Sequence, residues 1–326
     1  LSSWGRVKKL ENYGQMQSSF ISQGPSGSKA GSIIVPGNLA SLAIREILSE
    51  AKIKTKEAIF SIPDFSTFCT SFELPQMPEK ELPGAIRYNV SQYITLPITE
   101  VTLDWRVILS SAVDESPNKV FIVAIPNQVV KDYQKIAKDA GLELYSLEAE
   151  VFGITKSLIK ESNKTICLVD IGVQSSTLNI VDKGFLKRSY SFNFNSNQLS
   201  KVFSPSLGSE YGEPEKIKIK EDIITQNEKT DQTSYSLIDP LLTEVKNISD
   251  DFFQSEQRQV DEIYLTGGPA NLPGLEEYFA KILKKEVYIP NCFSGLLYHK
   301  ILEGTLLEMS PRFSVAVGVA LDGLEI

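Results

Sequence analysis

The segment that decides the fold reads Thr165-Ile166-Cys167-Leu168-Val169-Asp170-Ile171-Gly172-Val173-Gln174-Ser175-Ser176-Thr177-Leu178-Asn179-Ile180-Val181. Its apolar first part predicts a buried strand, and its last part predicts a second strand with apolar residues at alternating positions. The turn between them offers backbone N–H and hydroxyl groups that can hold a phosphate. A carboxylate at the end of the first strand can organise a hydrated cation. The same pattern also marks ordinary hairpins, so both interpretations stay open for this segment alone.

A second glycine motif follows a later strand, which is predicted over residues 260–266. The connection reads Gly267-Gly268-Pro269-Ala270 and leads towards a helix from Leu275. Adjacent glycines allow a planar or charged ligand to approach the backbone closely, and a helix N-terminus favours anions. The alternative interpretation is a tight strand-to-helix turn without a ligand. Together with the segment at 165–181, the motif favours a nucleotide cleft.

The composition is that of a soluble globular protein, with 42% hydrophobic and 23% charged residues in a chain of 326. A chain of this length usually forms more than one core, so we expect two or more domains. The formal net charge of -8 argues against a general nucleic-acid binder. No apolar run approaches the length needed to cross a bilayer, so membrane contact is expected to come through a partner.

Cysteine and histidine are scarce, and this narrows the possible chemistry. Cys69, Cys167 and Cys292 lie far apart, without zinc-binding spacing. Cys167 falls in an apolar run and is predicted to be a small core residue. Three cysteines and no signal peptide indicate a reducing cytoplasm. The chain contains one histidine, His299, which argues against histidine-based metal sites and against Ser-His or Cys-His catalysis.

Strand and helix patterns alternate along the chain, which predicts an α/β fold. Residues 58–147 follow the order β-β-α-β-β-α-β and are predicted to form a small α/β unit of their own. Residues 204–235 are polar and are predicted to be short helix and loop. Ser310-Pro311 is predicted to open the last helix. An order of strands followed by a helix occurs near the N-terminus and again from residue 165, which predicts two related halves with a cleft between them.

With these motifs the chain resembles the actin-like ATPases, and within them it is most similar to the PilM family of type IV pilus assembly. The more specific likeness lies where a helix ends and a strand begins, in Tyr93-Ile94-Thr95-Leu96-Pro97-Ile98-Thr99-Glu100-Val101. Residues 313–321 are similar to the last helix of that family. With the two glycine motifs, the resemblance covers nearly the whole chain.

The resemblance implies an actin-like (ribonuclease H-like) two-lobed α/β fold with a subdomain 1C of the FtsA/PilM type. The implied boundaries are 1–57 for the first part of subdomain 1A, 58–147 for 1C, 148–164 for a return to 1A, 165–310 for 2A and 2B, and 311–326 for a C-terminal helix that returns to 1A. The first phosphate loop of the superfamily would lie before the position of Leu1, so an N-terminal strand and loop are expected to precede this sequence.

The resemblance also implies that the full-length protein binds ATP with Mg²⁺ and hydrolyses it weakly or not at all. Asp170 would hold the metal through water, and no side chain stands out as a catalytic residue. The second phosphate loop would be formed by Asp170, Gly172, Ser175, Ser176 and Thr177. Gly267 and Gly268 would lie against the adenosine, and Glu215 and Lys216 near the ribose.

As for partners, the resemblance implies a cytoplasmic scaffold that binds the cytoplasmic N-terminal tail of a PilN-like inner-membrane protein. Tyr93, Ile94 and Pro97 are candidates for the groove that holds this tail. For Tyr93 and Ile94 the alternative is packing within the core of 1C. Pilus motor ATPases are further candidate partners, whereas nucleic acid and direct membrane insertion are not expected.

Two other functions of the same superfamily stay open. An FtsA-like division scaffold would carry a C-terminal amphipathic membrane helix, whereas this sequence ends soon after its last core helix. An actin-fold metabolite kinase would need a catalytic base beside a substrate pocket. Residues 58–147 show no cluster typical of sugar binding, which disfavours the kinase.

Overall fold

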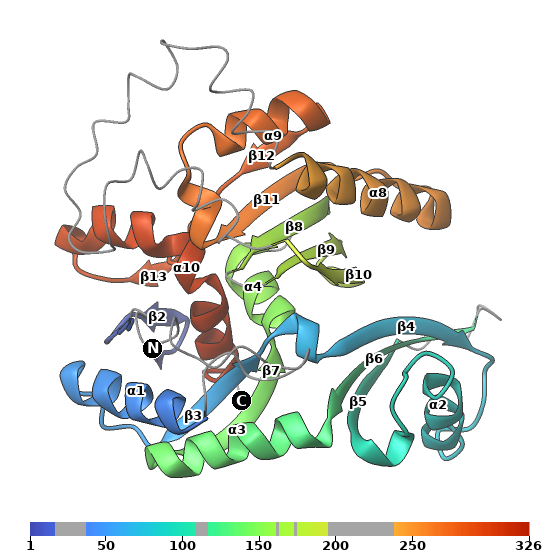
Figure 1. Ribbon diagram of the computed structural model, residues 1–326, viewed down its shortest axis with the longest axis horizontal. Coiled ribbons are helices and arrows are strands. Elements are labelled where there is room, and N and C mark those ends of the chain that lie inside the picture. Colours follow the sequence, from blue (N-terminus) through green and yellow to red (C-terminus); the bar gives the residue numbers. More distant parts are fainter. Residues whose placement is uncertain (17–36, 109–116, 161–162, 173–174, 195–237, 326) are drawn as a thin grey trace. The chain divides into compact units, whose positions relative to one another are not determined.

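The computed structural model describes residues 1–16, 37–108, 117–160, 163–172, 175–194 and 238–325 (Figure 1). The chain divides into two compact units. Unit 1 consists of Leu1–Gly153, Gly295–Tyr298 and Val319–Ile326, and unit 2 of Ile154–Ser294 and His299–Gly318. The chain crosses between the units four times, and two of these crossings fall inside helices, namely α4 (Glu150–Leu158) and α10 (Glu303–Asp322).

Unit 2 is built on a five-stranded sheet with the order β10-β9-β8-β11-β12. The strands are β8 (Thr165–Ile171), β9 (Ser176–Asp182), β10 (Phe185–Phe192), β11 (Glu262–Gly267) and β12 (Glu286–Tyr288). β8 pairs antiparallel with β9 and parallel with β11, so it is the central strand. Both strands predicted in the segment at 165–181 are therefore confirmed.

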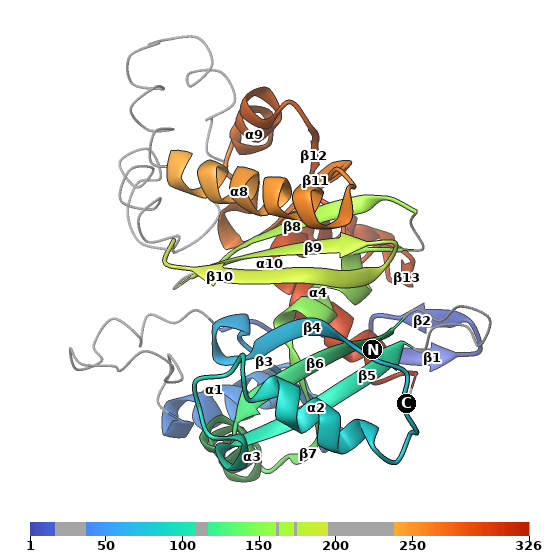
Figure 2. The same ribbon diagram turned by 90° about the vertical axis from the view of Figure 1, so that its right-hand side faces the viewer.

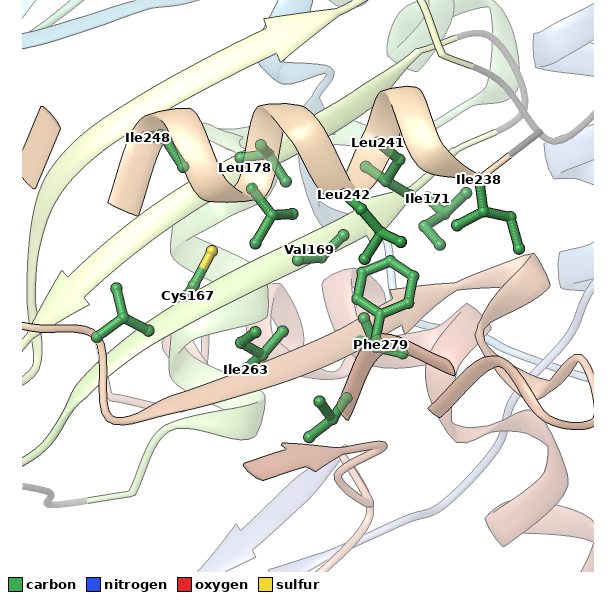
Figure 3. Packing of buried hydrophobic residues seen from close by; sticks show 14 of the residues in the cluster. Cys167, Val169, Ile171, Leu178, Ile238, Leu241, Leu242, Ile248, Ile263 and Phe279 are labelled. Carbon is green, nitrogen blue, oxygen red and sulfur yellow. The ribbon is translucent and has the colours of Figure 1, made fainter. Parts of the chain in front are cut away.

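Two helices cover one face of this sheet. α8 (Asp239–Glu256) and α9 (Leu275–Leu283) lie on one side in both views (Figures 1 and 2). Figure 3 shows Leu242 and Phe279 of these helices close to Val169 of β8, within one buried cluster. Cys167 belongs to this cluster as predicted, and burial raises the pKa of its thiol to about 12. The core therefore lies on the α8 side of the sheet.

The described strands of unit 1 form three separate sheets. β1 (Ser2–Trp4) and β2 (Val7–Lys9) form a hairpin, and β13 (Leu296–Leu297) adds to β2. β3 (Glu57–Ile62) and β7 (Glu143–Ala149) form a parallel pair. α1 (Gly37–Glu50) and α3 (Asn127–Ala140) pack side by side (Figures 1 and 2).

The segment at 58–147 follows the predicted order of elements, but its strands enter two sheets. β4 (Phe68–Leu74), β6 (Asn118–Pro126) and β5 (Val101–Ile108) form an antiparallel sheet of their own. α2 (Leu82–Val90) packs on this sheet, with Ile86 and Val90 fully buried against Ile122. β3 and β7 pair with each other instead. The boundaries of 1C and of the other subdomains stay a prediction.

Among the described elements, the order in unit 2 repeats in unit 1 once β4, α2, β5 and β6, which lie between β3 and α3, are left out. The hairpin β1–β2, helix α1, strand β3, helix α3 and strand β7 correspond to the hairpin β9–β10, helix α8, strand β11, helix α9 and strand β12. Both hairpins are antiparallel and both later pairs are parallel. Among the described residues of unit 1, no strand corresponds to β8. This shared order agrees with the prediction of two related halves, and the cleft between them stays a prediction.

The last helix begins earlier than predicted. α10 starts at Glu303, and Pro311 lies in its interior rather than in its first turn. Proline is favoured at the start of a helix, which made Ser310-Pro311 a plausible opening. Within a helix, proline removes one backbone hydrogen bond. Near this proline, the side chains of Thr266 and Asn271 donate hydrogen bonds to carbonyl groups of α10. Within the described residues, no helix is long and apolar enough to cross a membrane.

Candidate functional site

The turn between β8 and β9 places Asp170 at the end of the central strand. Asp170 pairs with Thr177 across the hairpin, and Ile171 pairs with Ser176. The Gly172 N–H donates to the Ser175 carbonyl oxygen at 3.1 Å and closes the turn. A Cβ at position 172 would lie 2.6 Å from that oxygen, so the turn requires glycine. Residues 173–174 lie outside the described part of the chain.

The second glycine motif meets the first. Thr266 and Gly267 of β11 pair with Asp170 and Ile171 of β8 in parallel register. Gly267 has φ +89°, and a Cβ there would lie 2.8 Å from Asp170 Oδ1 and 2.3 Å from the Ile171 carbonyl oxygen. At Gly268 a Cβ would meet no atom of the described residues within 4 Å. The backbone therefore passes directly beside the carboxylate at Gly267 and faces open space at Gly268.

A row of polar residues crosses the sheet at this level. Ser191, Thr177, Asp170 and Thr266 are successive cross-strand partners on β10, β9, β8 and β11. Thr177 Oγ1 lies 3.1 Å from Ser191 Oγ. Thr266 Oγ1 donates to the Pro311 carbonyl oxygen at 3.0 Å. The row lies on the face opposite the core cluster, because side chains alternate along each strand.

Asp170 is the one residue of β8 that is not fully buried. Burial nevertheless raises the pKa of its carboxyl group to about 6, because the site removes water from the charged form. Among the described residues, none donates a hydrogen bond to the carboxylate or forms an ion pair with it. Its oxygens are thus available to a hydrated cation or to another donor. No group of three or more His, Cys, Asp or Glu residues that could chelate a metal directly occurs in the described parts.

The other predicted phosphate-loop residues differ in their roles. Ser175 contributes the carbonyl oxygen that closes the turn. Ser176 is fully buried, and its hydroxyl donates to the Phe194 carbonyl oxygen at 2.9 Å. The side chain of Ser176 thus lies on the other face of β9 from that of Thr177. Glu215 and Lys216 lie outside the described residues, so their place near a ribose stays a prediction.

Thr266 is a residue of this site that the sequence patterns did not indicate. It is fully buried, and its Oγ1 lies 2.6 Å from Ser314 Oγ of α10 in addition to its bond with Pro311. Its place directly before Gly267 was visible in the sequence. The parallel register that sets it beside Asp170 was not, because register is a tertiary property.

The predicted groove residues lie in unit 1 between α2 and β5. Tyr93 stacks on Phe72, with ring centroids 5.9 Å apart and planes 7° apart, and is 50% exposed. Ile94 packs against the core of the β4–β6–β5 sheet. Pro97 is exposed and precedes the short helix Ile98–Glu100. A hollow of about 320 Å³ elsewhere in unit 1, between residues 13–16 and α1, is lined by other residues.

Three solved structures similar to this chain were compared with it. A chain of the PilM-PilN type IV pilus biogenesis complex is similar with a TM-score of 0.72 and 21% identity, over 93% of this chain and 90% of that chain. The ethanolamine utilization protein EutJ from Carboxydothermus hydrogenoformans is similar with a TM-score of 0.48 and 17% identity, over 91% and 78%.

The cytoplasmic domain of EpsL, an inner membrane component of the type II secretion system of Vibrio cholerae, has a TM-score of 0.41 and 10% identity, over 88% and 81%. The first of the three likenesses confirms the actin-like α/β fold of the PilM type. A family model described as type IV pilus assembly protein PilM matches residues 34–324. Because this match spans most of the sequence, the chain belongs to the PilM family of type IV pilus assembly proteins.

Proposed function

We propose that the protein is a nucleotide-binding scaffold of the type IV pilus inner-membrane assembly platform. The observation that carries the nucleotide part is the meeting of the two glycine turns beside Asp170. A carboxylate without a protein donor, a close backbone passage at Gly267 and open space at Gly268 lie together there. This combination fits a phosphate-bearing ligand and its hydrated cation.

In this proposal the ligand is ATP with Mg²⁺, bound in the full-length protein. Asp170 would hold the metal through water, and Mg²⁺ would supply positive charge that offsets the charge of the phosphates. Gly172, Ser175 and Thr177 would border the phosphates, and Gly267 and Gly268 the adenosine side. None of the described residues near Asp170 has the character of a general base, so we expect slow hydrolysis or none.

Calorimetric titration of Mg-ATP into the full-length protein tests this site. We expect saturable binding that weakens by about tenfold to a hundredfold in Asp170→Asn, since a charge-assisted interaction is lost. Asp250→Asn, at an exposed position on α8, is the matched control and should bind like the unaltered protein. Equal affinity of all three proteins would place the nucleotide elsewhere.

We further propose that unit 1 binds the cytoplasmic N-terminal tail of a PilN-like inner-membrane protein. Family membership supports this partner, as does the likeness to a chain of the PilM-PilN complex. The half-exposed ring of Tyr93 and the exposed Pro97 supply apolar surface for a peptide. The protein would thus be peripheral to the inner membrane through this partner, and pilus motor ATPases are further candidate partners.

Binding of a fluorescent tail peptide, followed by anisotropy, tests the groove. Tyr93→Ala and Pro97→Ala should weaken binding by about fivefold or more if these residues touch the peptide. Tyr88→Ala is the control, because Tyr88 is 72% exposed on α2 and lies outside the predicted groove. Peptide affinity that is unchanged in both groove variants would contradict the placement.

A further inference from the structure

The turn after β11 is tied to α10 at both of its ends. At its start, Thr266 Oγ1 donates to the Pro311 carbonyl oxygen at 3.0 Å and lies 2.6 Å from Ser314 Oγ. At its end, the Asn271 side-chain amide donates to the Glu308 carbonyl oxygen at 2.6 Å. Glu308, Pro311 and Ser314 follow one another at intervals of three residues, so they share one face of α10.

These bonds reach α10 where the helix is weakest. Pro311 has no N–H, so the Leu307 carbonyl loses its normal helical donor, and the ring crowds the preceding turn. Helices bend or open at such positions. Thr266 and Asn271 bond to carbonyl groups next to this break. They therefore stabilise a segment of α10 that its own backbone holds poorly.

The same turn is also in contact with the candidate nucleotide site. Gly267 passes so close to Asp170 and Ile171 that a single added Cβ would overlap both. The turn thus has little freedom to move without the end of β8. A ligand between Asp170 and Gly268 would restrain the turn, and through Thr266 and Asn271 it would restrain α10 around Pro311.

α10 continues from unit 2 into unit 1, because the division between the units falls between Gly318 and Val319. We propose that Thr266 and Asn271 are positioning residues that couple nucleotide occupancy at the glycine turn to the stability of α10 around Pro311. This inference rests on the proposed nucleotide site. Since coupling between two binding sites is reciprocal, tail binding in unit 1 and nucleotide binding in unit 2 should affect each other equally.

Hydrogen exchange of α10, read by mass spectrometry in the full-length protein with and without Mg-ATP, tests the coupling. In the unaltered protein, Mg-ATP should slow exchange in peptides that span residues 306–316. Asn271→Ala should still bind Mg-ATP but lose most of this protection. Asn247→Ala, at an exposed position on α8, should keep it. Thr266→Val should lose the protection and Thr266→Ser should retain it, because serine restores the hydroxyl.

A second readout is the affinity of the tail peptide with and without Mg-ATP. We expect a change of about fivefold or more in the unaltered protein, and a smaller change in Asn271→Ala. Unaltered exchange of α10 on saturation with Mg-ATP would overturn the coupling while leaving the nucleotide site in place. Equal protection in Asn271→Ala would overturn it as well. Absence of Mg-ATP binding in the unaltered protein would overturn the proposed site and the coupling together.

Discussion

At the scale of the residue, Asp170 is the group whose chemistry depends most on its surroundings. Asp170 lies near the end of the central strand, and its carboxyl group accepts no hydrogen bond from the described residues. Burial raises the pKa of this carboxyl group to about 6. The ionised form is therefore costly in the absence of a ligand. A cation would reverse this preference, because a nearby positive charge favours the carboxylate. Binding of Mg-ATP is thus expected to weaken as the pH falls below about 6.

The same pKa predicts how stability depends on pH without ligand. Because the folded pKa exceeds the unfolded value, protonation of Asp170 favours the folded state, and its contribution is lost as the pH rises from about 4 to about 6. Asp170→Asn should therefore raise the stability at about pH 7 by up to about 3 kcal/mol, and have little effect near pH 4. Thermal unfolding in the two buffers measures this. A variant less stable than the unaltered protein at neutral pH would contradict it.

Asn179 gives a second prediction at this scale. It is fully buried on β9, and neither its amide nitrogen nor its amide oxygen has a hydrogen-bond partner in the described parts of the chain. Burial of an unpaired polar group costs about 1–3 kcal/mol, so Asn179→Leu should raise the free energy of unfolding. Asn247→Leu, at an exposed position on α8, is the control and should change it little. Denaturant unfolding compares them, and a marked loss of stability in Asn179→Leu would contradict the prediction.

At the scale of the element, the two glycines after β11 have different tasks. Gly267 adopts φ +89° and has no room for a side chain, whereas Gly268 has open space around it. The first glycine is required by the fold and the second is available to a ligand. A substitution at Gly267 is therefore expected to affect the stability of the fold, and one at Gly268 the binding of a ligand.

We therefore expect opposite effects from two similar substitutions. Gly267→Ala should lower the melting temperature by several degrees, since strained backbone costs about 1–3 kcal/mol and the added methyl also overlaps Ile171. Gly268→Ala should leave the melting temperature nearly unchanged and weaken Mg-ATP binding, because its methyl enters the open space. Calorimetric melting and titration of both variants would check this. An unaffected nucleotide affinity in Gly268→Ala would argue against a ligand at this point.

The elements themselves were largely predictable, because their patterns are local. Alternating apolar residues indicated β9, mostly apolar runs indicated β6 and β8, and Gly141 ends α3 with φ +74°. The predicted start of α10 was wrong, because Pro311 was expected to open the helix and instead lies inside it. Thr266 and Asn271 donate hydrogen bonds to α10 near Pro311, and no local sequence pattern indicates these long-range contacts. For the candidate site, the sequence indicated Asp170 and the glycines of both turns. It did not indicate the register between β8 and β11 that brings them together.

At the scale of the whole molecule, the repeated topology relates the two units of the chain. A hairpin, a helix, a strand, a helix and a strand occur in the same order in each. Two helices, α4 and α10, pass from one unit to the other. The candidate nucleotide site lies in unit 2 and the candidate peptide groove in unit 1. A scaffold whose partner binding responds to nucleotide would use such continuous helices as its connection.

The location of the nucleotide is the central claim, and photoaffinity labelling of the full-length protein tests it most directly. Azido-ATP with Mg²⁺ would be cross-linked by light, and the labelled peptides identified by mass spectrometry. We predict labelling within residues 165–182 and 262–283, abolished by excess ATP and reduced in Gly268→Ala. Labelling confined to other segments, or labelling that excess ATP leaves unchanged, would contradict a nucleotide site between the two glycine turns.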